Sequence, residues 1–395
     1  MPEEIVILGG GVGGTLTANL LDKRLPKGSA RIKIVDPMGI HVYQPGFLYV
    51  ALGLANSGWL SRSLRSLLRP GIEVVIDSAV KIDAKSKKIL LERDGELSYD
   101  RLVIATGSYS DEQKVPGLHE GSYNFYSMAE AERLREALNN FTGGTILIGI
   151  AGMPYKCPPA PVEFAFLLDE MLRKRKIRDK TRIRFLSPLN RAFTIESASK
   201  MVQPLFEERG IELETFVNVD TVDPEKHELT SIEGETYSYD LAVLVPPHRA
   251  AAFLVDSGLV DKSGWLAVDP NTLEVVGQEG MYGIGDTTNL PISKSGSTAH
   301  FESPVVVEQI RRSIVGSNTN LLSSIGRIKR RSVSPSKLRY KGKVTCFLET
   351  GHRKATILIF NYDKPPNPPK PSVVWHLAKW FFNRIYWITV PRGRV

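Results

Sequence analysis

The chain has 395 residues, of which 42% are hydrophobic and 24% charged, which suits two or three packed domains and excludes a small disulfide-rich protein or a disordered chain. Its net charge of +8 is unevenly distributed, because residues 326–395 hold 16 of the 51 Lys and Arg residues but only two of the 43 acids. That region therefore carries +14 and the rest of the chain −6. A basic tail on a mildly acidic body indicates an anionic partner surface, either a membrane or a nucleic acid.

The targeting signals are few. The first apolar run, residues 5–8, is short and leads into glycines rather than into a cleavage site, so we expect no secretory signal and a chain that stays in the cytosol. No stretch of about 20 apolar residues occurs without charges, so we expect any membrane contact to be peripheral, at the cytoplasmic face of the cell membrane. The two cysteines, Cys157 and Cys346, fit neither zinc nor haem spacing, and no metal is expected.

The N-terminus has the pattern strand, glycine turn, helix, strand. Residues 5–8 and 31–36 read as the strands and residues 15–25 as the helix. A G-x-G-x-x-G turn lies between the first strand and the helix, and its glycines are Gly9, Gly11, Gly13 and Gly14. Such glycines allow a tight turn, a close approach to pyrophosphate and close helix packing, and Asp36 at the end of the second strand can bind ribose hydroxyls. The pattern predicts a dinucleotide site.

Two later segments indicate which dinucleotide binds. Residues 99–107 form an apolar strand that ends in Ala105, Thr106 and Gly107, and residues 280–286 form a strand that ends in Gly285 and Asp286. Together with the glycine turn, this trio resembles the flavoproteins with two dinucleotide-binding domains. The resemblance implies that these residues bind FAD, with Asp286 on its ribityl chain.

A second strand-turn-helix unit is predicted at residues 145–152, but its glycine motif has decayed. Ala151 and Pro154 stand at the second and third glycine positions, and proline has no N–H to offer a phosphate. The following strand, residues 182–188, ends without an acid that could hold an NADH ribose. We interpret the nicotinamide site as lost, and the loop that would hold phosphate carries Cys157 instead.

The order of these features closely resembles the sulfide:quinone oxidoreductases. The match includes Cys157 among prolines, Cys346 within residues 343–351, and residues 43–53, 160–163 and 291–296. It covers nearly the whole chain and implies that the two cysteines face each other beside the flavin as a redox-active disulfide or sulfur-bridged pair. Sulfide would be the electron donor, and membrane quinone the acceptor.

The resemblance also implies roles for single residues. Cys157 takes up the sulfur, and Cys346 is the thiolate that attacks the flavin ring. Glu163, where a helix is expected to begin, is the candidate base, although a solvated or helix-capping acid fits as well. Lys294 matches a lysine placed near the flavin or quinone, where it would stabilise reduced flavin. Residues 125–128 are not followed by the third cysteine of many members, so we expect FAD to be held non-covalently.

The C-terminal tail is expected to bring the protein to the membrane, where quinone would accept the electrons. Residues 373–390 interleave aromatic with basic residues, which suits a helix in the headgroup layer of an anionic lipid membrane, although a helix packed on the core or a subunit contact fits too. Further attraction to lipid is expected from Arg327, Lys329, Arg330, Arg331 and Lys337. Phe347 and Tyr43 are candidates to stack on the quinone ring, with ordinary core packing equally compatible.

The predicted fold is α/β with two Rossmann-like dinucleotide-binding domains. The FAD domain comprises residues 1–115 and 275–325, the degenerate second domain residues 116–274, and the C-terminal region residues 326–395, with Cys346 and the amphipathic membrane helix. The predicted function is an FAD-dependent sulfide:quinone oxidoreductase that makes polysulfide or sulfur, and association into homo-oligomers is left open.

Two other functions fit the sequence less well. A type 2 NADH:quinone dehydrogenase would need an intact second glycine loop and an acid after Leu186. A nucleic-acid-binding protein would use the basic tail, but the Trp and Phe residues there favour lipid over nucleic acid.

Overall fold

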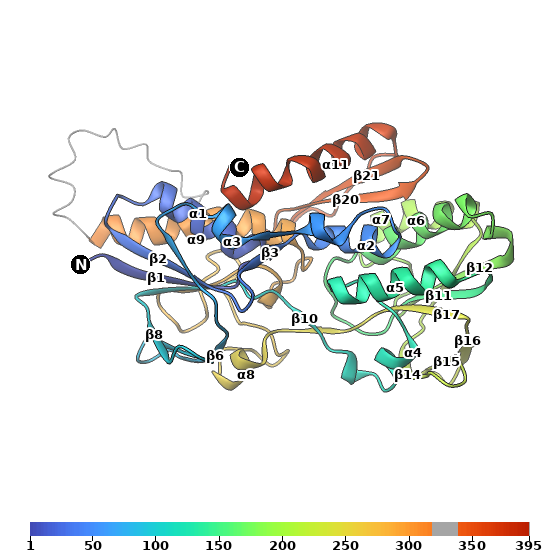
Figure 1. Ribbon diagram of the computed structural model, residues 1–395, viewed down its shortest axis with the longest axis horizontal. Coiled ribbons are helices and arrows are strands. Elements are labelled where there is room, and N and C mark those ends of the chain that lie inside the picture. Colours follow the sequence, from blue (N-terminus) through green and yellow to red (C-terminus); the bar gives the residue numbers. More distant parts are fainter. Residues whose placement is uncertain (318–338, 395) are drawn as a thin grey trace.

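The computed structural model describes residues 1–317 and 339–394 and has two lobes, each built on a parallel sheet (Figure 1). The first sheet has the order β19 (Met281–Gly283), β9 (Arg101–Ile104), β1 (Glu3–Leu8), β2 (Ala30–Val35) and β5 (Ile72–Val75). All its neighbouring strands are parallel. The apolar run of β1 is fully buried, as expected for a strand covered on both faces.

The second lobe has a four-stranded parallel sheet. Its order is β13 (Ile211–Thr215), β12 (Thr181–Ser187), β11 (Gly144–Ile150) and β17 (Leu241–Val245). Its helices are α5 (Met128–Asn140), α6 (Ala160–Lys174) and α7 (Glu196–Glu208). Two parallel sheets with helices confirm the predicted α/β class.

Smaller elements connect these layers. The other helices are α1 (Val12–Arg24), α2 (Phe47–Ala51), α3 (Leu64–Leu67), α4 (Leu118–Gly121), α8 (Ala252–Asp256), α9 (Gly296–Ser317) and α11 (Val373–Ile385). The antiparallel groups are β6 (Ala79–Asp83), β7 (Lys88–Leu91) and β8 (Glu96–Ser98); β14 (Val219–Asp223), β15 (Glu228–Ser231) and β16 (Thr236–Ser238); β3 (Ile40–Val42) with β4 (Ser61–Ser63); β10 (Tyr109–Ser110) with β18 (His248–Arg249); and β20 (Val344–Gly351) with β21 (Lys354–Phe360).

The chain returns to the first lobe before β19. Ala250, Leu254 and Trp265 already pack in the same buried cluster as β1, and β19 then adds to the edge of the first sheet next to β9. The division at residue 275 remains a proposal, and this packing favours a return near residue 250. Helix α9 follows and packs along α1, so the two helices share one face of the first sheet.

The C-terminal region bridges the two lobes. The hairpin β20–β21 packs on α6 and α9, and α11 lies over β21 (Figure 1). After α11, the short turns η7 (Tyr386–Ile388) and η8 (Val390–Arg392) carry the chain to α1. Within the described residues, none of the helices combines the length and the apolar character needed to span a membrane. The five cations predicted to add attraction, Arg327, Lys329, Arg330, Arg331 and Lys337, lie outside the described residues.

Candidate functional site

The glycine turn at the start of α1 forms a cradle that is packed too closely on backbone at Gly9 and Gly14 for side chains and is open at Gly11. A Cβ at Gly9, where φ is +102°, would lie 2.5 Å from the carbonyl oxygen of Ala105, and one at Gly14 would lie 1.9 Å from the carbonyl oxygen of Gly9. At Gly11, the N-cap of α1, a Cβ would meet nothing within 4 Å. The first turn of α1 has no acidic side chain and no side-chain cap, so its N–H groups are free to bind a pyrophosphate.

Asp36 closes this cradle after β2. Its carboxylate accepts hydrogen bonds from the backbone N–H groups of Gly10 at 2.8 Å, Met38 at 3.0 Å and Gly39 at 2.8 Å. These bonds fix the carboxylate next to the glycine turn and leave further acceptor capacity for hydroxyl donors. The cradle therefore fits the adenosine and pyrophosphate of a dinucleotide.

The loop after β19 brings Asp286 and Lys294 to the far end of the cradle. The Lys294 ammonium donates to the carbonyl oxygens of Asp286 at 3.0 Å and Thr288 at 2.7 Å, and it lies 3.3 Å from the ring centroid of Trp265. Burial lowers the pKa of Lys294 to about 8, although the carboxylate of Asp286 opposes the shift. Burial raises the pKa of Asp286, against the charges of Lys156 and Lys294. Lys294 thus holds this loop as well as supplying positive charge.

The loop after β11 places Cys157 against this lysine. The N–H of Cys157 donates to the carbonyl oxygen of Lys294 at 2.7 Å, and its own carbonyl accepts from Ala160 at 2.9 Å. Cys157 has φ of +54°, in the left-handed region that a non-glycine residue adopts only when its surroundings hold it there. Helix α6 then begins with prolines at its N-terminus, so it offers few N–H groups to a phosphate.

Cys346 reaches the same place from β20. The N–H of the preceding Thr345 donates to Ser297 Oγ at 2.9 Å, which fixes β20 beside the first turn of α9. Burial raises the pKa of Cys346 to about 12, opposed by a hydrogen bond to Ser295 and by the Lys379 ammonium. Burial also raises the pKa of Cys157, and the adjacent Cys346 raises it further. The fold thus brings the two cysteines together as free thiols, and the bridge between them remains a prediction.

Glu163 lies in the first turn of α6 and is 3% exposed, so it is neither solvated nor a helix cap. Its carboxylate forms an ion pair with the ammonium of Lys379 from α11, which is itself only 7% exposed. Burial raises the pKa of Glu163 in spite of this partner. Burial would lower the pKa of Lys379, but the carboxylates of Glu163 and Glu349 raise it above its ordinary value. The charges of this pair act on the pKa of both thiols: Glu163 raises it and Lys379 lowers it.

The inward face of α11 is polar along its whole length. His376 Nδ1 lies 3.0 Å from Glu349 Oε2, the Tyr43 hydroxyl donates to Asn383 Oδ1 at 2.5 Å, and the Tyr386 hydroxyl lies 2.7 Å from His41 Nε2. With Lys379, these residues recur every three or four positions and form one stripe. Each buried polar group on the stripe thereby has a partner on β20, α6 or the segment around β3.

The two quinone candidates both lie under α11. The ring centroid of Phe347 is 6.4 Å from that of Phe382, and the Tyr43 ring is 4.3 Å from Tyr386. Phe382 and Tyr386 are themselves 6.1 Å apart, so a row of rings joins the two candidates. Tyr43 is buried and Phe347 half-buried.

Sequence reasoning missed Lys379, which it grouped with the lipid-facing cations of the tail. A helical projection of residues 373–386 carries the missing signal, because Lys379 shares a face with His376 and Asn383 and not with Trp380 and Phe381. It also left all histidines unplaced, whereas the N–H of His248 donates to the carbonyl oxygen of Pro154 in the loop that carries Cys157. No sequence spacing could have indicated His248, because β18 is held at the site by its pairing with β10 and by its bond to the loop of Pro154.

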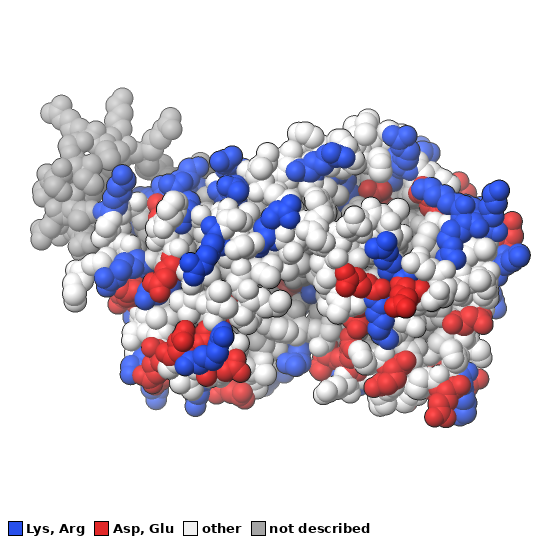
Figure 2. Space-filling model, viewed as in Figure 1, with Lys and Arg blue, Asp and Glu red and all other residues white. Residues whose placement is uncertain are grey.

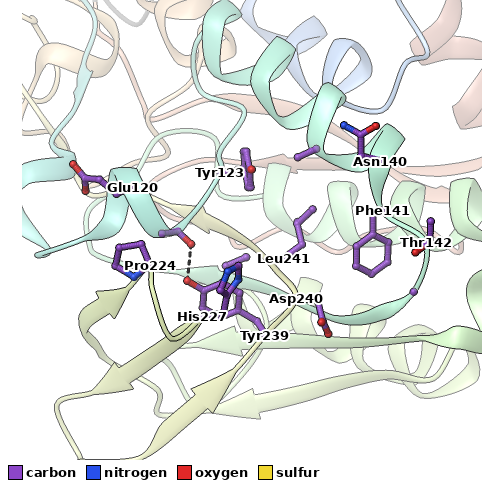
Figure 3. Close-up of a pocket in the computed structure, with 14 residues that line it drawn as sticks. Glu120, Tyr123, Asn140, Phe141, Thr142, Pro224, His227, Tyr239, Asp240 and Leu241 are labelled. Carbon is purple, nitrogen blue, oxygen red and sulfur yellow. Dashed lines mark hydrogen bonds between the residues drawn. The ribbon is translucent and has the colours of Figure 1, made fainter.

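A second feature of the fold is a cavity of about 420 Å³ in the second lobe, whose walls include Tyr123, Phe141 and Asp240 (Figure 3). It lies where β11 and β17 begin, whereas Cys157 follows the end of β11. Ligands of parallel sheets bind at the carboxyl ends of the strands. We therefore take the cysteine loop, and not this cavity, as the candidate reaction site.

Residues 3–303 match the pyridine nucleotide-disulphide oxidoreductases, and the chain belongs to that family. The mitochondrial sulfide:quinone oxidoreductase of Mus musculus is 28% identical over 408 residues, which cover 99% of this chain and 86% of the mouse protein. The sulfide-quinone reductase of Aquifex aeolicus is 25% identical over 403 residues, covering 96% of this chain and 88% of that protein. Both relatives match this chain along nearly its full length.

Solved structures share the fold. The X-ray structure of the Aquifex aeolicus sulfide:quinone oxidoreductase has a TM-score of 0.85 at 21% identity and covers 99% of this chain and 92% of its own. The structure of NDH2 from Plasmodium falciparum has a TM-score of 0.71 at 15% identity, covering 100% of this chain and 96% of its own. The family implies FAD, which the glycine cradle and Asp36 fit, and the chain is a flavoprotein oxidoreductase.

Proposed function

We propose that this protein oxidises sulfide to polysulfide or sulfur and passes the electrons through FAD to a membrane quinone. The proposal rests above all on the meeting of Cys157 and Cys346, which come from the second lobe and from the C-terminal hairpin and share one environment with Glu163 and Lys379. The similarity of this chain to proteins named sulfide:quinone oxidoreductase and sulfide-quinone reductase supports the same function.

The first step is thiol–disulfide exchange. Hydrosulfide attacks the bridge between the cysteines, a new S–S bond leaves a persulfide on Cys157, and the broken bond leaves its electron pair on Cys346 as a thiolate. The Lys379 ammonium and Ser295 lower the pKa of Cys346 and so stabilise that thiolate. Because burial keeps both free thiols protonated, the bridge supplies an electrophile that needs no prior deprotonation of the cysteines.

When bound, FAD accepts two electrons from sulfur and delivers them to quinone. Overall, HS⁻, one proton and quinone give sulfane sulfur and quinol. Asp286 and Lys294 are proposed to face the cofactor, and Gly9, Gly11, Gly13, Gly14, Asp36, Ala105, Thr106, Gly107 and Gly285 to hold it. Glu163 is proposed as the base that accepts the proton from the sulfur, and Lys379 would hold its carboxylate in place.

An anaerobic absorbance trace tests the proposal. We expect sodium sulfide to bleach the flavin of the purified holoenzyme and NADH to leave it oxidised, because α6 begins with prolines and the glycine motif is absent there. Bleaching by NADH without bleaching by sulfide would instead favour the NADH:quinone dehydrogenase.

The outer face of α11 supports contact with a membrane. Its exposed side chains are apolar apart from Arg384, and they include Val374, 69% exposed, Phe381, 58%, Leu377, 49%, and Trp380, 48%. In the view of Figure 2, Lys and Arg side chains line the edge that carries α11, and most Asp and Glu lie toward the opposite edge. Apolar side chains flanked by cations suit the headgroup layer of an anionic membrane, and quinone would reach Phe347 and Tyr43 from there.

We expect the double variant Trp380→Ser/Phe381→Ser to bind anionic vesicles at least tenfold more weakly than the wild type, because each ring contributes roughly 1.5–3 kcal/mol when buried in lipid. Sulfide should bleach its flavin as before. The matched control is Phe216→Ser/Ile232→Ser, which removes side chains that are 63% and 70% exposed on the second lobe. Vesicle co-sedimentation measures the effect, and equal losses in both variants would refute the assigned membrane face.

A further inference from the structure

Four side chains form the wall of the site next to Cys157, and none of them has a role in the reaction described above. Tyr155 and Lys156 immediately precede Cys157, His248 comes from β18, and Tyr126 precedes α5. All four are buried, with exposed fractions of 6% for Tyr126, 4% for Tyr155, 9% for Lys156 and 4% for His248. We name these four residues the tyrosine–lysine–histidine wall.

The wall is one connected group. The ring of His248 meets that of Tyr126 edge-on at 5.0 Å, and the Lys156 ammonium lies 6.0 Å from the Tyr126 centroid. The N–H of His248 donates to the carbonyl oxygen of Pro154 at 2.9 Å, which fixes β18 to the loop that carries Cys157. Tyr126, Tyr155 and Lys156 each lie close enough to interact electrostatically with the Cys157 sulfur.

Three polar atoms of the wall have no partner within the described part of the chain. They are Tyr126 Oη, Tyr155 Oη and His248 Nε2, all buried from solvent. A buried hydroxyl or ring nitrogen without a hydrogen bond costs free energy, so most such groups in proteins are paired. Lys156 likewise forms no ion pair among the described residues, and burial lowers its pKa against the charges of Asp286 and Cys157. The wall thus gathers three unpartnered polar atoms and an ammonium without an ion pair next to the loop that carries Cys157.

The kind of ligand that fits the wall depends on which of its groups donate and which accept hydrogen bonds. His248 Nδ1 lies 2.9 Å from the carbonyl oxygen of Pro246, which can only accept, so Nδ1 carries the hydrogen. Burial lowers the pKa of His248 to about 3, helped by the Lys156 ammonium, so the ring is neutral and Nε2 is an acceptor. The wall therefore offers two hydroxyl donors, one ammonium and one acceptor.

This set fits a small anion that also carries one hydrogen. Hydrosulfide has a single negative charge to accept hydrogen bonds from Lys156 and the tyrosines, and one S–H to donate to His248. A halide lacks the donor, and water lacks the charge. We propose that Tyr126, Tyr155, Lys156 and His248 bind the hydrosulfide substrate beside Cys157, an inference that rests on the proposed function and assigns its substrate subsite.

The test compares four variants, Tyr126→Phe, Tyr155→Phe, Lys156→Met and His248→Leu, with the control Tyr99→Phe. Tyr99 is 5% exposed, and its hydroxyl is also buried without a partner, but it belongs to the core of the first lobe. We expect the sulfide concentration that half-saturates anaerobic flavin bleaching to rise roughly threefold to tenfold in each Tyr→Phe variant. It should rise at least tenfold in Lys156→Met and His248→Leu, and the control should match the wild type.

A second readout does not depend on the flavin. Alkylation of Cys157 in the reduced holoenzyme by iodoacetate relative to iodoacetamide, measured by peptide mass spectrometry, reports how well the wall accepts an anion. We expect this ratio to fall in Lys156→Met and in both Tyr→Phe variants of the wall, and to stay constant in Tyr99→Phe. The isosteric Tyr→Phe changes keep the test open if the Lys156 or His248 variant does not fold.

The outcomes separate the two hypotheses. A wild-type flavin that sulfide does not bleach overturns the proposed function itself, and the subsite with it. A wild type that bleaches normally, with variants that keep its half-saturation and alkylation ratio, overturns the subsite alone. Loss of FAD or a shifted flavin spectrum with unchanged half-saturation also overturns it, because the wall would then face the cofactor rather than the substrate.

Discussion

Cys157→Ser and Cys346→Ser should each abolish the bleaching of the flavin by sulfide, with at least a thousandfold lower rate, while the protein remains yellow. Either change leaves one thiol, so no bridge can form for hydrosulfide to attack. Neither cysteine belongs to the glycine turn or to the Asp36 loop, so FAD should stay bound. Anaerobic stopped-flow absorbance after mixing with sodium sulfide measures the rate.

Chemical reduction provides the control for this experiment. Dithionite should bleach the wild type and both serine variants alike, which shows that the flavin remains present and reducible. A serine variant that sulfide still bleaches at the rate of the wild type would remove the cysteines from the reaction, whatever the fold resemblance.

The second large effect concerns the ion pair between Glu163 and Lys379. We expect Glu163→Gln and Lys379→Met each to lower the free energy of unfolding by about 3–5 kcal/mol, because either change leaves its partner as an uncompensated buried charge. The double variant should recover most of this loss, since it buries no charge. Urea unfolding of the holoenzyme, with the four proteins arranged as a double-mutant cycle, measures the coupling.

A surface pair supplies the matched control. Glu196 and Lys200 form an ion pair of 2.6 Å on α7, but their side chains are 65% and 75% exposed. The same substitutions there should leave stability unchanged within error, because water already solvates both charges. Additive losses in the buried cycle, without recovery in the double variant, would contradict a direct Glu163–Lys379 interaction.

The same ion pair changes how the tail is understood. The sequence favoured a helix whose cations attract lipid, with packing on the core as an alternative, whereas Lys379 is buried in an ion pair with Glu163 and its outer neighbours reach the surface. His376, Lys379 and Asn383 lie on one face of the helix. From the sequence alone, such a polar face is compatible with contact to water and with contact to buried polar partners. Glu163, Glu349 and Tyr43 are those partners, and they lie up to 340 residues away in the chain.

Local sequence alone determined the glycine turn, the acid at the end of β2 and the two parallel sheets, because these follow from backbone freedom at Gly9, from the missing Cβ at Gly14 and from runs of apolar strand residues. It also showed that Ala151 and Pro154 replace the second and third glycines of the second turn, and that Cys157 follows in the same loop. Only the tertiary structure decided that Lys379 faces Glu163 and that His248 lies against the cysteine loop. The physical reason is that a buried polar group needs a partner, and which distant segment supplies that partner is set by packing rather than by spacing along the chain.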